Sequence, residues 1–249
     1  MPIDVGQHNL EIHANAEHWR RKPLLQEIYR DFYVEIASEL RLDLPGETVE
    51  IGSGIGNLKT VVPAALATDL FPNPWLDRVE NAYSLSFAGG SVANVILFDV
   101  WHHLEYPGTA LAEFYRVLTP GGRLVIFDPA MGILGRIVYG LFHHEPLGLR
   151  DEIHWWAPAG FSASEMTYYA AQGNAHRIFF SKKWASRLGD WRTVRQSFQA
   201  AISYVASGGF SGPQLYPRSL LSGMRAIDRI ASCVPAWFAT RLLVVLEKK

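Results

Sequence analysis

Cysteine is the scarcest residue of this chain, with Cys233 alone among 249 residues. A single cysteine excludes an internal disulfide and a zinc site built from cysteines, and it fits a reducing cytoplasm. Clusters of basic residues are also missing, since 23 Lys and Arg stand against 24 Asp and Glu for a formal net charge of -1. Without a basic patch there is no electrostatic footprint for nucleic acid, so we expect no nucleic-acid partner.

Long hydrophobic runs are absent as well. The most lipophilic stretch, "MGILGRIVYGLF" at 131–142, contains Arg136 and is far shorter than the roughly 20 apolar residues that a membrane span needs. The first 19 residues are polar and lack the apolar centre of a signal peptide. We therefore expect a soluble, cytoplasmic protein, and the sequence leaves contact with a membrane surface open.

The apolar pattern predicts an α/β protein. Hydrophobic residues make up 49% of the chain, enough for the core of one large domain. Helical spacing predicts helices over 23–40, 107–118 and 217–232, and short β-branched or apolar runs predict strands over 48–52, 64–69, 91–100, 123–128 and 239–249. A turn at 120–122 precedes the fourth of these strands. Strands that alternate with helices favour a parallel sheet covered on both faces.

This alternation is lost between 128 and about 191. A structureless loop of that length is rare in a compact domain, so we expect small helices there. The segment follows a parallel strand and should lie near the ligand edge of the sheet. It is also crowded with aromatic residues, which could form a satellite core or line a site: Trp155, Trp156, Phe161, Tyr168, Tyr169, Phe179 and Phe180. We interpret the segment as a mobile, aromatic-lined lid.

The stretch "VEIGSGIGN" at 49–57 places Gly52, Gly54 and Gly56 on alternate positions behind an acidic residue. A glycine-rich turn between strand and helix allows a ligand to approach the backbone closely. The dinucleotide motif G-x-G-x-x-G would place its third glycine at Asn57. Asp69 ends the second strand, where a carboxylate can bind both ribose hydroxyls. A nicotinamide dinucleotide and an adenosyl cofactor both carry that diol.

A longer series of strings carries a family resemblance. "VEIGSGIGN", "ATDL", "NAYSLSF", "ILFDVWHHLEYP" and "FYRVLTPGGRLVIFDP" resemble, in order and spacing, the class I S-adenosylmethionine-dependent methyltransferases. The chain is most similar to the small-molecule branch related to ubiquinone and sterol methyltransferases, known as methyltransferase type 11. The resemblance covers 49–129 and, loosely, the last strand.

This resemblance implies a Rossmann-like methyltransferase fold: a mostly parallel seven-stranded sheet with helices on both faces and an insertion after the fifth strand. We expect one domain over 1–249. Within it, 1–46 would form a helical segment over the site, 47–129 the cofactor-binding core, 130–190 the lid, and 191–249 the completion of the sheet.

The resemblance also implies the cofactor, S-adenosyl-L-methionine, and the residues that bind it. The glycines would form the turn under its methionine end, Asp69 would bind the ribose, and Ala82 would face the adenine. The full set of expected cofactor-binding residues is Glu50, Gly52, Gly54, Gly56, Asp69, Leu70, Asn81, Ala82 and Asp99. Asn81 departs from the aspartate that the family usually has. The short run from Gly56 to Pro63 departs too, because it allows only about two helical turns.

Methyl transfer needs a general base only where the nucleophile must lose a proton. The sequence offers three places for such a base: "WHHL", the strand end at Asp128, and "FHHEP". We take His103, Asp128 and His144 as candidate catalytic residues. A histidine of "WHHL" could instead pack in the core, and Asp128 could cap a turn. Because the contiguous His143, His144 and Glu145 cannot all face one ion without a distorted backbone, we expect no metal.

We expect the acceptor to be a small, partly apolar molecule with an oxygen, nitrogen or carbon nucleophile, such as a secondary metabolite, a lipid or a glycan precursor. "FDVW" lacks the Asn-Pro-Pro-aromatic signature of base-modifying enzymes. Two alternatives remain: a non-catalytic scaffold of the same fold and, against the glycine spacing, an NAD-dependent oxidoreductase. The sequence leaves the oligomeric state open.

Overall fold

The computed structural model describes residues 5–165 and 168–249, so four residues of the expected segment 1–46 and two of the expected lid lie outside the described part. Seven strands occur in the described part: β1 Glu47–Ile51, β2 Leu66–Asp69, β3 Arg78–Val79, β4 Val92–Phe98, β5 Leu118–Pro129, β6 Trp191–Gln199 and β7 Arg241–Lys248. The α-helices are α1 Val5–Arg21, α2 Pro23–Ser38, α3 Pro107–Val117, α4 Ile133–Leu141, α5 Asn174–Phe179, α6 Ile202–Ala206, α7 Leu221–Ala231 and α8 Pro235–Phe238.

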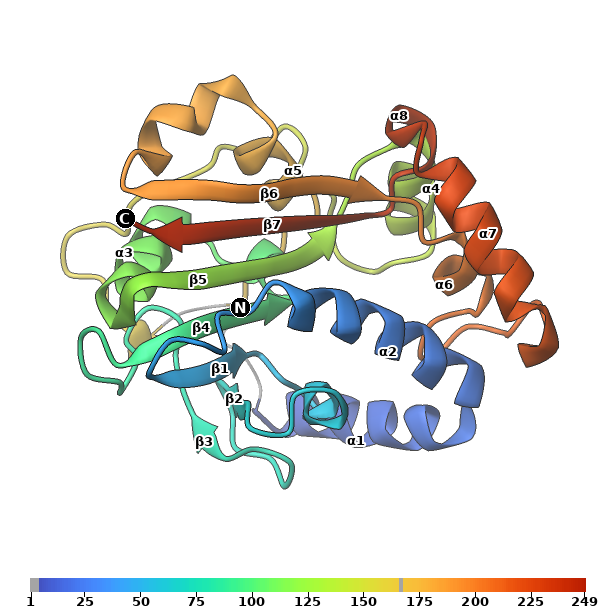
Figure 1. Ribbon diagram of the computed structural model, residues 1–249, viewed down its shortest axis with the longest axis horizontal. Helices are drawn as coiled ribbons and strands as arrows, with labels where there is room; N and C mark the ends of the chain where they lie inside the picture. The colour runs from blue at the N-terminus through green and yellow to red at the C-terminus, as the bar shows by residue number, and fades with distance from the viewer. Residues whose placement is uncertain (1–4, 166–167) are drawn as a thin grey trace.

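The seven strands form one sheet in the order β3-β2-β1-β4-β5-β7-β6 (Figure 1). Four of its pairings are parallel. The pairings of β7 with β5 and with β6 are antiparallel, because β7 runs against all the others. The predicted fold, a mostly parallel seven-stranded Rossmann-like sheet, is therefore confirmed.

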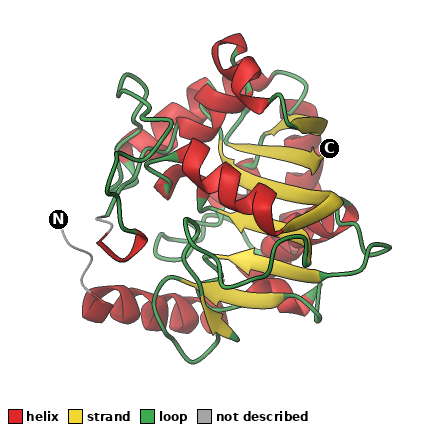
Figure 2. Cartoon of the chain, turned by 90° about the vertical axis from the view of Figure 1, so that its left-hand side faces the viewer, coloured by secondary structure: helices red, strands yellow, loops and turns green. Residues whose placement is uncertain are grey.

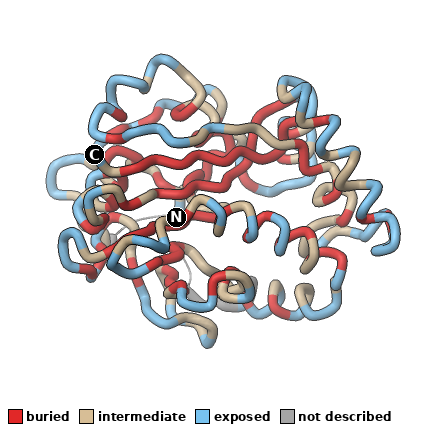
Figure 3. The backbone as a smooth tube through the Cα atoms, in the orientation of Figure 1, coloured by how far each residue is buried: buried red, intermediate tan, exposed pale blue. Residues whose placement is uncertain are grey.

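Both faces of this sheet are buried, as its continuous apolar strands require. Every residue of β4 is buried. Successive side chains point to opposite faces: Val95 and Leu97 pack in the cluster that contains α3, while Ile96 and Phe98 pack in the cluster that contains α2. Figure 2 shows helices on both sides of the sheet, and Figure 3 shows that the central strands are its most buried part.

Several expected elements occur close to their predicted bounds, among them α2, β1, β2, β4, α3 and β7. The helix after the glycine loop is reduced to a 3₁₀ turn, η1 Asn57–Thr60, as the short run to Pro63 predicted. The expected turn at 120–122 was wrong in one respect. It belongs to β5, where the pairing with β4 shifts register between Leu118 and Arg123. The strand β6 has an exposed, polar outer pattern that gave no clear strand signal.

The segment between β5 and β6 contains α4, α5 and two 3₁₀ turns, η3 Ala163–Glu165 and η4 Lys182–Leu188. The expectation of small helices in this segment is thus confirmed. Part of the segment packs in the main core, since Trp155 and Phe179 are both buried there. The insertion is therefore continuous with the core of the domain along part of its length.

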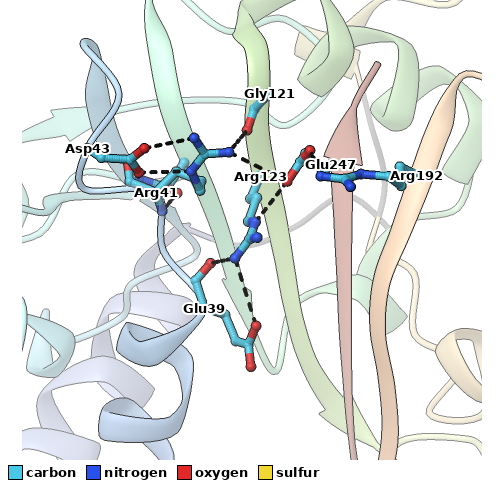
Figure 4. A network of polar contacts seen from close by, with 8 residues as sticks. Glu39, Arg41, Asp43, Gly121, Arg123, Arg192 and Glu247 are labelled. Carbon is cyan, nitrogen blue, oxygen red and sulfur yellow. Dashed lines mark hydrogen bonds and ion pairs between the residues drawn. The ribbon is translucent and has the colours of Figure 1, made fainter.

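A network of charges joins the strands at the edge where the parallel strands begin (Figure 4). Glu247 of β7 accepts hydrogen bonds from Arg123 of β5, at 3.2 Å, and from Arg192 of β6. Arg123 also donates to the carbonyl oxygen of Glu39, at 2.7 Å, just beyond α2. The network fixes the C-terminal strands to one another and to α2 at the edge opposite the glycine loop. No described helix is long and apolar enough to cross a membrane.

Candidate active site

The glycine loop leaves β1 in a conformation that requires glycine. Gly52, Gly54 and Gly56 all have positive φ, at 71°, 54° and 67°. Side-chain-bearing residues rarely adopt these angles. A Cβ atom at Gly52 would also lie 2.4 Å from Cγ2 of Val100. The alternating glycines therefore have a backbone cause that is independent of any ligand.

Asp69 holds this loop from the end of β2. Its Oδ2 accepts a hydrogen bond from the amide of Gly54 at 2.9 Å, and its Oδ1 accepts one from the amide of Leu70 at 2.7 Å. Ser53 adds two more contacts between the loop and β2, because its amide donates to the carbonyl of Thr68 and its hydroxyl accepts from the amide of Thr68. Asp69 therefore fixes the loop to the end of β2 through both carboxylate oxygens.

A cavity of about 360 Å³ opens beside the loop, within the size range of small-molecule sites. Most of the residues expected to bind the cofactor lie together in its wall. Expected cofactor-binding residues that line it are Gly52, Gly54, Asp69, Leu70, Asn81, Ala82 and Asp99. Ile12 and Asn15 of α1 close one side, and His103, Leu104, Tyr168 and Tyr169 form another.

Two members of the expected set lie behind the wall. Gly56 has a packing role, because a Cβ there would lie 3.1 Å from the carbonyl oxygen of Trp75. Glu50 is buried beneath the loop, and burial raises the pKa of its carboxyl to about 8. Its Oε2 has no hydrogen-bond partner among the described residues. A buried carboxyl oxygen without a partner requires an explanation, and a ligand's ammonium group is one.

Asn81 is occupied by the protein itself. Its Oδ1 accepts from the amide of Tyr83 at 2.9 Å, and its Nδ2 donates to the carbonyl of Ala163 at 2.8 Å. Ala163 belongs to the insertion, so this side chain links the cavity wall to the insertion. An aspartate could not donate that bond, which gives a structural reason for asparagine at this position.

Asp99 sits at the end of β4 in an unusual conformation. Its φ is 55°, a left-handed value seen at turns and functional sites. Its carboxylate forms an ion pair with Arg241, which is almost fully buried on β7. The Arg241 guanidinium also lies 4.8 Å from the ring of Tyr204. Arg241 was not among the expected site residues, although an arginine that opens the apolar run "RLLVVL" was a usable signal.

Beyond Asp99, the chain brings "WHHL" and "FHHEP" together. His102 and His103 lie in the 3₁₀ turn η2 Trp101–His103, which follows β4. Nδ1 of His102 lies 3.0 Å from Oδ1 of Asp128, and Nδ1 of His103 lies 3.0 Å from the carbonyl oxygen of Tyr169. Nε2 of each ring faces the carboxylate of Glu145, at 3.5 Å for His102 and 3.6 Å for His103.

Burial and neighbouring charges shift the pKa values of His102, His103, Glu145 and Asp128. Burial alone would lower the pKa of His102, but the Asp128 carboxylate and Glu145 raise it to about 10. Burial and the neighbouring His102 lower the pKa of His103 to about 4. Burial opposes ionisation of Glu145, yet the contacts with the two histidines and Tyr168 hold its pKa below the usual range. The pKa of Asp128 is raised by burial.

The three candidate catalytic residues have different surroundings. His103 lines the cavity. Asp128 is fully buried and contacts His102, so it lies behind the wall. His144 is exposed and stacks on His143, at 4.9 Å between ring centroids, outside the cavity wall. Of "FHHEP", therefore, it is Glu145 that reaches the cluster at the cavity.

The aromatic residues of the insertion divide between two roles. Trp155 and Phe179 are buried in the core, and Phe180 stacks on Phe198 at 3.9 Å. Tyr168 and Tyr169 instead line the cavity. The first three therefore pack in the main core and not in a separate satellite core, whereas the two tyrosines line the cavity.

Comparison with known proteins gives the class of this fold and site. Residues 50–126 match the family model described as a methyltransferase domain. A search of the curated proteins gives no significant sequence match. The matched segment contains the glycine loop, Asp69, Asn81, Asp99 and "WHHL", which is most of the cavity wall.

Solved structures share the fold. A SAM-dependent methyltransferase from Archaeoglobus fulgidus superimposes with a TM-score of 0.53 and 12% identity, over 90% of this chain and 94% of that chain. The geranyl diphosphate C-methyltransferase of Streptomyces coelicolor A3(2), solved with Mg²⁺, geranyl diphosphate and S-adenosyl-L-homocysteine, gives a TM-score of 0.50 and 13% identity, over 88% and 77%.

Residues 50–126 thus resemble a methyltransferase domain, and the chain as a whole has the Rossmann-like fold of the solved S-adenosylmethionine-dependent methyltransferases. The ubiquinone and sterol branch stays a prediction, because the match is to the family as a whole.

Proposed function

We propose that this cavity binds S-adenosylmethionine and that the protein transfers its methyl group to a small, partly apolar acceptor. One observation carries the proposal. The glycine loop with Asp69 and the polar cluster with His103 face a single cavity from different sides. A methyl donor bound along the loop would therefore lie next to a second compartment with its own polar groups.

The residues fit the cofactor in chemical terms. The backbone of Gly52 and Gly54 permits close approach, and the Asp69 carboxylate lines the cavity at the strand end where such an acid can bind ribose hydroxyls. Leu70 and Ala82 offer apolar contact for the adenine ring. Adenine recognition through Asn81 is reduced, since both ends of its amide contact the protein.

S-adenosylmethionine supplies an electrophilic methyl group on a sulfonium, so the protein chiefly has to hold the acceptor in line and exclude water. Ile12 of α1, Leu104 and the two tyrosines Tyr168 and Tyr169 provide the apolar surfaces around the polar cluster. A few polar groups within apolar walls are the usual arrangement for orienting a partly apolar ligand.

Where the acceptor must lose a proton, His103 is the residue in position to take it. Its Nδ1–H donates to the carbonyl of Tyr169 at 3.0 Å, which leaves the Nε2 lone pair toward the cluster. With its pKa lowered to about 4, the ring is neutral near pH 7. Asp128 would act through His102 as a positioning residue.

The test compares ligands on the purified protein. Calorimetry with S-adenosylmethionine, S-adenosylhomocysteine and NAD should show micromolar binding of the first two and weak binding of NAD, and mass spectrometry should identify ligand carried through purification. A methyl-transfer assay would use acceptors with an apolar chain and a hydroxyl or carboxyl group. Tighter binding of NAD would contradict the proposal, and cofactor binding without transfer to any acceptor would favour the scaffold alternative.

A further inference from the structure

His102, His103 and Glu145 bring one ligand atom each to a common point. These three atoms lie within 4.8 Å of one another. The separations from Nε2 to the carboxylate, 3.5 and 3.6 Å, exceed the 2.7–3.2 Å of ordinary hydrogen bonds. They involve both oxygens of the carboxylate, Oε2 toward His102 and Oε1 toward His103, and each is close to the spacing of about 3.4 Å between neighbouring ligands of an ion with bonds of about 2.1 Å.

Further contacts with the protein hold each of these residues in place. Nδ1 of His102 pairs with Asp128, and Nδ1 of His103 pairs with a backbone carbonyl. The Glu145 carboxylate accepts hydrogen bonds from Tyr168 and Gln172. Metal-binding histidines generally donate their other N–H to a carboxylate or a carbonyl in this way, which fixes the ring and its tautomer. Here the pattern holds for both rings.

Electrostatics makes the centre of the cluster a site for a cation. With both Nδ1 atoms protonated, each Nε2 presents a lone pair, and the carboxylate presents negative charge. Glu145 and His102 are buried, so water screens this charge poorly. A single positive charge at the centre would interact favourably with the two Nε2 lone pairs and with the carboxylate. It can be a proton on a histidine or a metal ion.

We propose that His102, His103 and Glu145 bind one divalent transition-metal ion at the acceptor end of the cavity. Two imidazoles and a carboxylate suit Zn²⁺, Fe²⁺, Mn²⁺ or Co²⁺. Three protein ligands leave coordination positions open, as in catalytic metal sites. His103 and Tyr168 line the cavity, so the open positions face it.

The expectation of no metal concerned a different set of residues. It depended on His143, His144 and Glu145 being contiguous in the chain. The fold instead combines Glu145 with two histidines from the turn after β4. His143 lies 3.7 Å from Glu145, and the exposed His144 stays outside the cluster. The geometric objection therefore does not apply to the cluster that forms.

A metal would change the role of His103. Its Nε2 has one lone pair, so the ring is either a ligand or a proton acceptor. As a Lewis acid, the ion would bind an oxygen of the acceptor and lower its pKa, which removes the need for a protein base. This last role rests on the proposed methyl transfer, whereas metal binding by the three residues does not.

The experiment measures metal directly on tag-free, full-length protein. After treatment with chelator and dialysis, Co²⁺ is titrated and followed by its visible absorption, and Zn²⁺ is titrated in competition. We expect one equivalent per chain. Glu145→Gln and, separately, His103→Asn should each weaken Co²⁺ binding by at least about 100-fold, because loss of an outer-shell partner alone costs 10–100-fold. His154→Gln, an exposed histidine outside the cluster, is the matched control and should bind as wild type.

Binding of S-adenosylhomocysteine is measured on the same samples. It shows whether each variant folds, and it separates failure of the metal site from failure of the proposed function. Less than stoichiometric Co²⁺ binding by the wild type would overturn the metal site. So would equal binding by wild type, Glu145→Gln and His103→Asn. In either case a proton occupies the cluster, and His103 keeps its role as proton acceptor.

Discussion

Replacement of Asp69 by alanine tests the assignment on which the cofactor site depends. In the structure this carboxylate accepts from the amides of Gly54 and Leu70. In the proposed complex it also accepts from the ribose hydroxyls. Hydrogen bonds to a charged group contribute about 1.5–3 kcal/mol each, so loss of even one such bond should weaken S-adenosylmethionine binding roughly 10–100-fold.

The effect on the loop has to be separated from the effect on the ligand. Asp77 offers a matched control, because it also holds a backbone amide near β2. Its Oδ2 accepts from the amide of Ala67 at 2.8 Å and lies 2.5 Å from Nζ of Lys59, yet Asp77 is not part of the cavity wall. Asp77→Ala should therefore cost stability with little change in affinity.

Calorimetry with S-adenosylhomocysteine on wild type and both variants is the measurement, with thermal melts to confirm folding. Asp69→Asn should be intermediate, since one oxygen acceptor remains while the charge is lost. Equal affinity in wild type and Asp69→Ala would refute the ribose contact. An equal loss in Asp69→Ala and Asp77→Ala would mean that loop stability, and not ligand contact, controls binding.

Three further predictions concern buried charge and exposed apolar surface. Burial raises the pKa of Glu50 from 4.5 to about 8, so the stability contributed by this neutral carboxyl is fully present below pH 4.5 and is lost as the pH rises to 8. Glu50→Gln should therefore raise the unfolding free energy at pH 8 by about 2–5 kcal/mol and leave it unchanged at pH 4, as urea titrations at both pH values would show. Asp99→Ala leaves the buried Arg241 without its partner and should cost about 3–5 kcal/mol, and no loss in urea unfolding would contradict that pairing. If the protein contacts membranes, we expect the contact at the exposed end of α4, where Leu141 and Phe142 are exposed. The double variant Leu141→Ser, Phe142→Ser should then abolish sedimentation with anionic vesicles, and absence of vesicle binding by the wild type would exclude the contact.

The glycine loop and its neighbour Asp69 could be placed at one sheet edge from the sequence because their signals are local. Gly52 and Gly54 require positive φ within one turn, and Asp69 ends the strand that pairs beside them. Parallel strands of this kind end at the same edge, so order along the chain already places these residues together. The buried strand β4 and the amphipathic helices were equally readable, since periodicity reports burial directly.

The contacts that join distant segments around the cavity required the tertiary structure. Nothing in the order of residues indicates that Asn81 donates to a carbonyl in the insertion, or that Arg241 of the last strand pairs with Asp99. Each contact joins segments far apart in the chain. Each also depends on the direction of one side chain, which periodicity does not encode.

"FHHEP" shows the same division most clearly. The sequence identified its histidines and glutamate as polar residues that need a reason in an apolar segment, and this was sound. Which of them reaches the site was decided by the path of the chain after α4, which turns Glu145 inward to His102 and His103 and leaves His144 outside. The local sequence determines which polar groups are available. The packing of distant segments determines which of them come into contact, because a buried charge is stable only where the fold supplies its partners.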